Sequence, residues 1–148
     1  MALEIRFLTF KNGEEELDTT VADDYYAGYP LEFTANGKVA VCKDKGATSF
    51  CGLARNDKSV DAANGKVTYV GKGSIVAIGA SSVGGTDTPL LEAFSVIQPK
   101  DDLYIDAATG KLTRVAPASP FKAVAKVLKK DSATEKVIVE IQFVPTVG

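Results

Sequence analysis

The chain has 148 residues, with 17 Lys and Arg against 19 Asp and Glu, 45% hydrophobic residues, and neither His nor Trp. A single domain is the expectation, because a chain of about 150 residues buries roughly 68–70% of its unfolded surface without a metal or disulfide. The formal net charge of −2 argues against a nucleic-acid module. Without His the chain lacks the commonest general base and the commonest zinc ligand. We therefore expect no enzyme and no cofactor.

The N-terminus carries no basic segment followed by an apolar run, and no stretch approaches the roughly 18 apolar residues of a membrane span. We expect no membrane partner and synthesis in a cytoplasm. Cys42 and Cys51 are nine positions apart, which fits neither a Cys-x-x-Cys site nor a disulfide framework. The two thiols can meet across a hairpin, but in a reducing compartment two small semi-buried side chains are the favoured interpretation.

Tight turns are the main organising signal along the chain. Asn-Gly occurs at Asn12-Gly13, Asn36-Gly37 and Asn64-Gly65, and Thr109-Gly110 has a similar setting. Asn and Gly tolerate the positive φ that hairpin turns require, so these sites predict hairpins. Their uneven spacing argues against a repeat protein and favours one β domain that reuses the same turn chemistry.

The runs between these turns have strand character. In chain order, strands are predicted at residues 3–10, 38–42, 66–70, 74–78, 93–97, 103–106 and 136–144. They predict an all-β fold, an antiparallel sandwich or barrel of about ten short strands with hairpin turns and long loops, with room for one short helix. Residues 1–26 are expected to form an N-terminal strand or arm and a loop, and residues 27–148 a single β domain.

Residues 120–130 have two possible structures. Phe121, Val124, Ala125 and Leu128 share one helical face, and Ser119-Pro120 resembles a helix start. The same run also alternates as a strand that can pair with the strand beginning at Lys136. The all-β context favours the hairpin. Residues 23–30 and 79–89 are expected to be loops.

Known chemical motifs fail on spacing. Five residues separate Gly65 from Gly71, whereas a phosphate-binding loop has four between its glycines. Residues 57–61 offer oxygen ligands at calcium-loop spacing, but Ala62 and Thr68 stand where such a loop needs Gly and Glu. Acidic pairs such as Asp101-Asp102 are interpreted as solvated loop residues. Among nineteen acids, the sequence singles out no catalytic carboxylate pair.

Two groups of residues are candidate interfaces. Leu3, Ile5 and Phe7 share one face of the first predicted strand, which either begins the domain or adds to the edge of a neighbouring sheet. A second group consists of three clustered tyrosines, Tyr25, Tyr26 and Tyr29. These tyrosines either cover part of the core or anchor an interface, and the sequence favours neither alternative.

Several phrases of the chain resemble the decoration, or cement, proteins of tailed-bacteriophage capsids. They are Ala-Gly-Tyr-Pro-Leu at residues 27–31, Phe-Cys-Gly-Leu-Ala at 50–54, Lys-Gly-Ser-Ile-Val-Ala-Ile at 72–78, the segment 101–113 with its Thr-Gly-Lys turn, and Ala-Val-Ala-Lys-Val at 123–127. The resemblance covers roughly residues 27–144. Asp101 and Ala125 depart from it, since Gly often stands at both positions in such proteins.

The resemblance implies a structural virion protein without an active site. Such a protein binds the outside of a capsid, commonly as a homotrimer. Its partners are then the major capsid protein and further copies of itself, with no nucleic acid and no membrane, and its place is the capsid surface after assembly in the bacterial host cytoplasm. Two alternatives remain open: another phage structural β module, of the tail or baseplate, and a carbohydrate-binding β domain.

Overall fold

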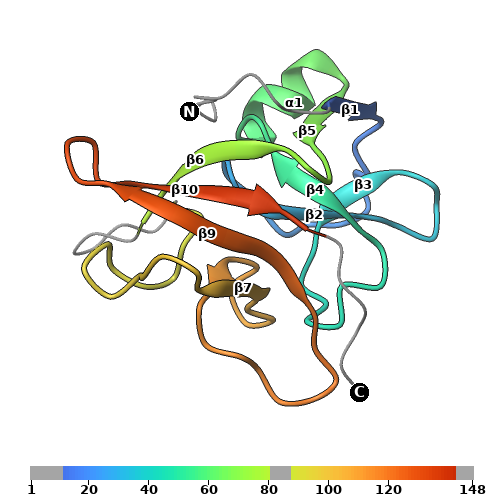
Figure 1. Ribbon diagram of the computed structural model, residues 1–148. Coiled ribbons are helices and arrows are strands. Elements are labelled where there is room, and N and C mark those ends of the chain that lie inside the picture. Colours follow the sequence, from blue (N-terminus) through green and yellow to red (C-terminus); the bar gives the residue numbers. More distant parts are fainter. Residues whose placement is uncertain (1–11, 81–87, 143–148) are drawn as a thin grey trace.

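The computed structural model describes residues 12–80 and 88–142, which form two five-stranded antiparallel sheets and one short helix (Figure 1). The N-terminal sheet has the order β1 (Asn12–Glu15), β5 (Val67–Val70), β4 (Phe50–Ala54), β2 (Pro30–Phe33), β3 (Val39–Val41). The C-terminal sheet has the order β6 (Ile75–Gly79), β10 (Lys136–Ile141), β9 (Ala123–Asp131), β7 (Asp102–Ile105), β8 (Leu112–Thr113). The helix α1 (Lys58–Asn64) connects β4 to β5. The predicted all-β fold is confirmed.

The N-terminal sheet curls into a half-barrel. Its two edges are β1 and β3, and the chain that follows β1 bridges them. The Asp18 amide donates to the Val39 carbonyl, and the Val39 amide donates to the Glu16 carbonyl, each at 2.9 Å. An isolated parallel bridge joins Leu17 to Val39 at the same place. Residues 16–18 therefore satisfy backbone groups that a bare sheet edge would expose.

Two apolar clusters fill the described part of the chain. The larger lies between the sheets and combines side chains of the N-terminal sheet, such as Leu53 and Val70, with the inner face of the C-terminal sheet. The smaller lies inside the half-barrel and contains Leu17, Tyr25 and Tyr29. Since strand side chains alternate between faces, the N-terminal sheet contributes to both clusters, one on each side.

Three predicted hairpins are present. Gly37, with φ of 73°, turns β2 into β3, and Gly110, with φ of 76°, turns β7 into β8. The third hairpin joins β9 to β10, which resolves the choice between helix and strand at residues 120–130 in favour of the strand. A register shift between Ile138 and Val139 leaves Leu128 as an extra residue in β9.

Two of the four predicted turn sites are wrong. Asn64-Gly65 ends α1 instead of joining two strands, because Gly65 takes the left-handed conformation at the helix C-terminus. Asn12 and Gly13 lie within β1, paired with Val70 and Tyr69. A Cβ on Gly13 would meet the Tyr69 ring at 2.0 Å, so close packing accounts for this glycine.

The strand predicted at residues 93–97 is also wrong. Residues 94–96 form a turn, with Phe94 packed against the larger cluster, and Ile97 is fully buried. The Lys130 ammonium lies 4.4 Å from the centre of the Phe94 ring. The apolar run thus reaches the core without forming a strand. The predicted first strand at residues 3–10, most of the loop predicted at 79–89 and the last residues of the 136–144 strand lie outside the described residues.

Candidate functional site

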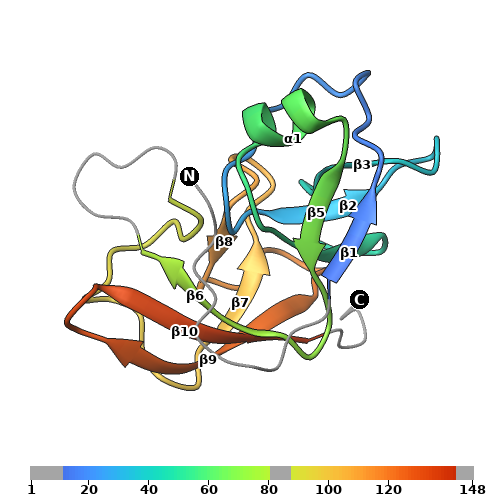
Figure 2. The same cartoon turned by 90° about the horizontal axis from the view of Figure 1, so that it is seen from above.

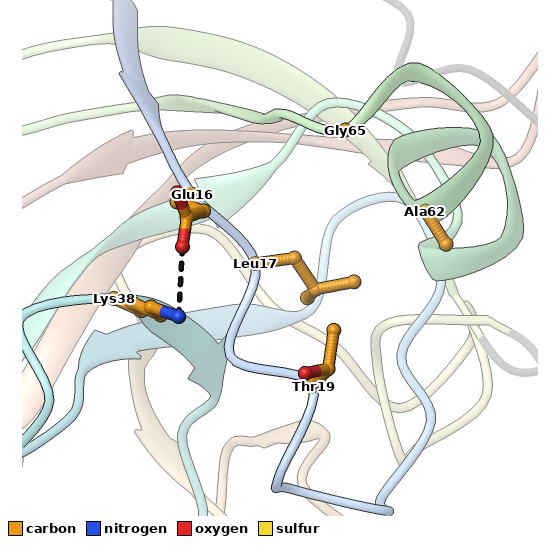
Figure 3. Close-up of a pocket in the computed structure, with 6 residues that line it drawn as sticks. All are labelled: Glu16, Leu17, Thr19, Lys38, Ala62 and Gly65. Atoms are coloured by element: carbon orange, nitrogen blue, oxygen red, sulfur yellow. Dashed lines mark ion pairs between the residues drawn. The ribbon is translucent and has the colours of Figure 1, made fainter.

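A pocket of about 280 Å³ lies where the half-barrel closes, between the end of β1, the start of β3 and α1 (Figure 3). It is lined by Glu16, Leu17, Thr19, Lys38, Ala62 and Gly65. Leu17 is buried as part of the inner cluster, whereas Thr19 and Ala62 are exposed. The closure of the half-barrel therefore positions the pocket, because residues 16–19 run directly beside β3.

The charges in this pocket neutralise each other. The Lys38 Nζ lies 2.8 Å from the Glu16 carboxylate, with side chains 40% and 62% exposed (Figure 3). The hydrogen bond from Lys38 lowers the pKa of Glu16, and the same contact raises the pKa of Lys38. Both groups thus keep their charges near neutral pH and are poorly suited to proton transfer. The pocket therefore offers little acid–base chemistry.

Beside this pocket, the buried carboxylate of Asp18 stabilises the point where residues 16–18 bridge the two edges of the N-terminal sheet. Asp18 is 1% exposed and accepts hydrogen bonds from the Thr20 amide (3.0 Å) and hydroxyl (2.6 Å). The Thr34 hydroxyl (2.6 Å) and the Asn36 side-chain amide (3.1 Å), both from the β2–β3 turn region, donate to its other oxygen. These donors, Thr20 foremost, hold the pKa of Asp18 well below its ordinary value. The cluster fastens residues 18–20 to the β2–β3 hairpin.

The three candidate tyrosines do not share one environment. Tyr25 is fully buried and Tyr29 is 3% exposed, so both belong to the inner cluster. Tyr26 is half-buried and packs edge-to-face on Tyr29, with ring centres 5.7 Å apart. The burial of Tyr25 and Tyr29 favours core cover over an exposed anchor. Leu3, Ile5 and Phe7 lie outside the described residues.

Tyr25 forms a buried pair with Asp61 on α1. The Tyr25 hydroxyl donates to the Asp61 carboxylate at 2.5 Å, and Asp61 is 1% exposed. Burial raises the pKa of Asp61, against the opposing effect of the Tyr25 hydrogen bond, and burial also raises the pKa of Tyr25. The pair ties α1 to the chain before β2. Both side chains are buried, and the pair thus has a structural role.

The thiols are also interior groups. Cys42 and Cys51 are both free and buried. Burial raises the pKa of both, that of Cys51 to about 12, so each remains a protonated thiol at neutral pH. Because the thiolate is the nucleophile and metal ligand, neither side chain is activated for such chemistry.

The described residues contain no group of three or more His, Cys, Asp or Glu side chains that could hold a metal ion. The acidic pair Asp101-Asp102 instead meets basic partners. The Arg114 Nε lies 2.8 Å from Asp101, and the Lys126 Nζ lies 3.4 Å from Asp102. Within the described ranges, no helix is long and apolar enough to cross a membrane.

The sequence did not predict the buried carboxylates. Asp61 and Tyr25 are 36 positions apart, and only the fold brings them together. Asp18 has one local signal, a Thr two residues later, a spacing at which an Asp side chain caps the following backbone. Comparisons with known proteins add no relative: no family model matches the chain, and no curated protein matches it.

Proposed function

We propose that the chain is a structural protein that decorates the outside of a phage capsid and stabilises the shell. The observation that carries the proposal is the all-β body, in which two sheets share one apolar cluster and the buried carboxylates and thiols serve the interior. A cement protein needs a stable body that presents a surface. The sequence phrases that resemble such proteins lie on β2, β4, β6, β7, β8 and β9.

Exposed apolar side chains indicate where binding is best sought. Among the described residues, the large hydrophobic side chains that are most exposed are Phe33, Val60, Leu91, Val96, Val115 and Leu128. Four of the six belong to the segment between β6 and the end of β9, and Val115 is 62% exposed. Surface apolar groups of this kind are typical of interfaces when they gather. The C-terminal half is therefore the first surface to test.

The central experiment mixes purified protein with expanded capsids that lack decoration and measures co-sedimentation and resistance of the shells to heat. We expect binding, and we expect the free protein to be a homotrimer by light scattering. Val115→Asp should weaken binding, whereas Val60→Asp, a matched substitution on α1, should leave it unchanged. A monomer that never sediments with capsids would overturn the proposal.

Two further measurements separate the alternatives. Electron microscopy of labelled virions should place the protein on the capsid, and a label on the tail or baseplate would assign it to the other class of phage part. A glycan array should give no specific signal. Specific glycan binding that Lys38→Ala abolishes would instead make the pocket beside α1 a carbohydrate site.

A further inference from the structure

The same five residues occur twice in the chain, in two different structures. Ala-Asn-Gly-Lys-Val stands at residues 35–39 and again at residues 63–67. The first copy turns β2 into β3, and the second ends α1 and leads into β5. Asn36 and Asn64 are both exposed, at the surface of the N-terminal half (Figure 2). Because their neighbours in sequence are identical, any difference in the chemical behaviour of the two asparagines comes from the fold.

Asn-Gly is the dipeptide in which an asparagine side chain converts most readily, because glycine has no Cβ to hinder the approach of its backbone nitrogen. The glycine nitrogen bonds to the side-chain carbonyl carbon of the asparagine. The bond from that carbon to the side-chain nitrogen breaks, and ammonia leaves with the glycine amide proton. Water then opens the cyclic imide at either carbonyl and gives aspartate or isoaspartate.

Space does not distinguish the two sites. Gly37 and Gly65 have almost the same left-handed backbone, with φ of 73° and 74°. Nothing lies within 4 Å of the Cβ position of either glycine, so both sites leave room for the cyclic imide. The difference between the sites must therefore come from the hydrogen bonds of the reacting groups.

Both reacting groups at Asn36 are bound. The Asn36 side-chain amide donates to the Asp18 carboxylate at 3.1 Å, and the Gly37 amide, the nucleophile, donates to the Thr34 carbonyl at 3.0 Å. The Thr34 hydroxyl donates to the same Asp18 oxygen at 2.6 Å, so the carboxylate is fixed beside the turn. Asn36 must break a hydrogen bond to a charged group before its side chain can turn toward Gly37.

Asn64 is the last residue of a helix that is bound at its other end. Asp57, Lys58 and Asp61 each form a hydrogen bond with a residue of the segment 21–27. Residues 62–66, in contrast, are all exposed. A helix of seven residues is marginal where packing does not support it, and helix ends fray. Fraying of this last turn releases the Gly65 amide and lets the Asn64 side chain rotate onto it.

We propose that Asn64 is a site of spontaneous deamidation in the folded protein, and that Asp18 protects the identical sequence at Asn36 from the same reaction. Conversion of Asn64 places a carboxylate at the C-terminus of α1, whose last turn has no basic residue to offset it. The new charge also adjoins the pocket that Ala62 and Gly65 line. The proposal concerns the chemistry of the isolated chain and does not rest on the capsid function.

Timed incubation of the full chain at mildly alkaline pH compares both sites in one sample. Aliquots are digested in mild acid, where the reaction is slow, and mass-spectrometric fragmentation measures aspartate and isoaspartate at each site. We expect Asn64 to convert at least about tenfold faster than Asn36, whose hydrogen bonds must break first. In urea the two rates should agree within about twofold, because the unfolded chain exposes the same five residues at both sites.

Two outcomes of this incubation would overturn the proposal. Equal rates in the folded protein, including no conversion at either site, would show that the end of α1 is as protected as the turn. Faster conversion at Asn36 would show that its hydrogen bonds do not restrain the reaction.

Replacement of Asp18 tests which group protects Asn36. In Asp18→Ala, Asn36 should convert at least about fivefold faster than in the parent protein, while the Asn64 rate stays within about twofold. Asp106→Ala, which removes a carboxylate from the turn between β7 and β8, is the matched control and should change neither rate. An unchanged Asn36 rate in Asp18→Ala would show that another group protects this site.

Circular dichroism verifies that each variant is folded during the incubation. If Asp18→Ala unfolded the chain, both sites would convert at the rate seen in urea, and Asp18→Asn would replace it. That variant keeps the shape of the side chain and removes its charge, so Asn36 alone should again accelerate, by a smaller factor. Equal acceleration at Asn64, or none at Asn36, would contradict the assigned role of Asp18.

Discussion

Buried carboxylates occur at two places in the N-terminal half. Their surroundings shift the two pKa values in opposite directions, down for Asp18 and up for Asp61. Asp18 is held by four donors from Thr20, Thr34 and Asn36, which favour its charged form. Asp61 receives the Tyr25 hydroxyl but is dominated by burial, which favours its neutral form. Each residue therefore makes stability depend on pH, with opposite signs.

The Asp18 pKa is lowered in the folded protein, so its contribution to stability is present above the ordinary value of 3.8 and is lost as pH falls through the folded value. We expect Asp18→Asn to lower Tm by several degrees at neutral pH, with the gap to the parent protein narrowing in acid. Thermal unfolding across a pH series measures this gap. Asp106→Asn, which alters a surface turn with Thr109, is the matched control and should change Tm little. A gap that stays constant with pH would contradict the prediction.

The Asp61 pKa is raised in the folded protein, so its contribution is fully present below 3.8 and is lost as pH rises through the folded value. Asp61→Asn removes this titration. We therefore expect the free energy of unfolding of the parent protein, relative to the variant, to decrease as pH rises from acid to neutral. Urea unfolding of both proteins at several pH values measures the difference. An increase over the same range would show that the carboxylate is stabilised in its charged form.

At the scale of elements, one glycine in β4 is required by both conformation and space. Gly52 has φ of 155° and lies beside the register shift between Leu31 and Glu32. A Cβ at this position would lie 2.1 Å from the Val70 carbonyl oxygen of the neighbouring strand. Backbone atoms cannot give way as a flexible side chain would, so any side chain here forces β4 and β5 apart.

Gly52→Ala is therefore expected to destabilise the protein far more than Gly37→Ala. Gly37 also has positive φ, of 73°, but nothing lies within 4 Å of its Cβ position. Its replacement costs only the conformational strain, about 1–2 kcal/mol, whereas Gly52→Ala adds overpacking of about 1–3 kcal/mol or more. Urea unfolding measures both losses. Equal losses would show that the β4–β5 contact relaxes freely.

The elements also show what the sequence can predict. Hairpins at Gly37 and Gly110 followed from local turn chemistry, because two residues suffice to reverse the chain. Asn64-Gly65 has the same turn chemistry but ends a helix. A glycine in the left-handed conformation can form a hairpin turn or a helix C-cap, and the packing of α1 determines which of the two forms here. For residues 120–130, the all-β context correctly favoured a strand, β9, over a helix. The closure at Asp18 also depends on Thr34 and Asn36, which lie 16 and 18 positions away, so the local signal from Thr20 could not reveal it.

At the scale of the whole molecule, the two sheets depend on each other. The larger cluster contains Leu53 from β4 and Leu103 from β7, and both are fully buried. Each sheet covers the apolar face that the other presents to this cluster. The smaller cluster lies on the opposite side of the N-terminal sheet and cannot replace that cover. The dependence suits a protein that must act as one rigid body, as the proposed role on a capsid requires.

Leu53→Ala and Leu103→Ala should each lower the free energy of unfolding by about 2–5 kcal/mol, the range for large-to-small core substitutions. Tyrosine fluorescence reports mainly the N-terminal half, where Tyr25, Tyr29 and Tyr69 are buried. Far-ultraviolet circular dichroism reports the strands of both sheets. Because the cluster is shared, we expect both signals to shift together in urea, whichever leucine is replaced. Val115→Ala, at an exposed position, should shift neither. If Leu103→Ala lowered the dichroism midpoint and left the fluorescence midpoint unchanged, the sheets would unfold separately and the single-body description would fail.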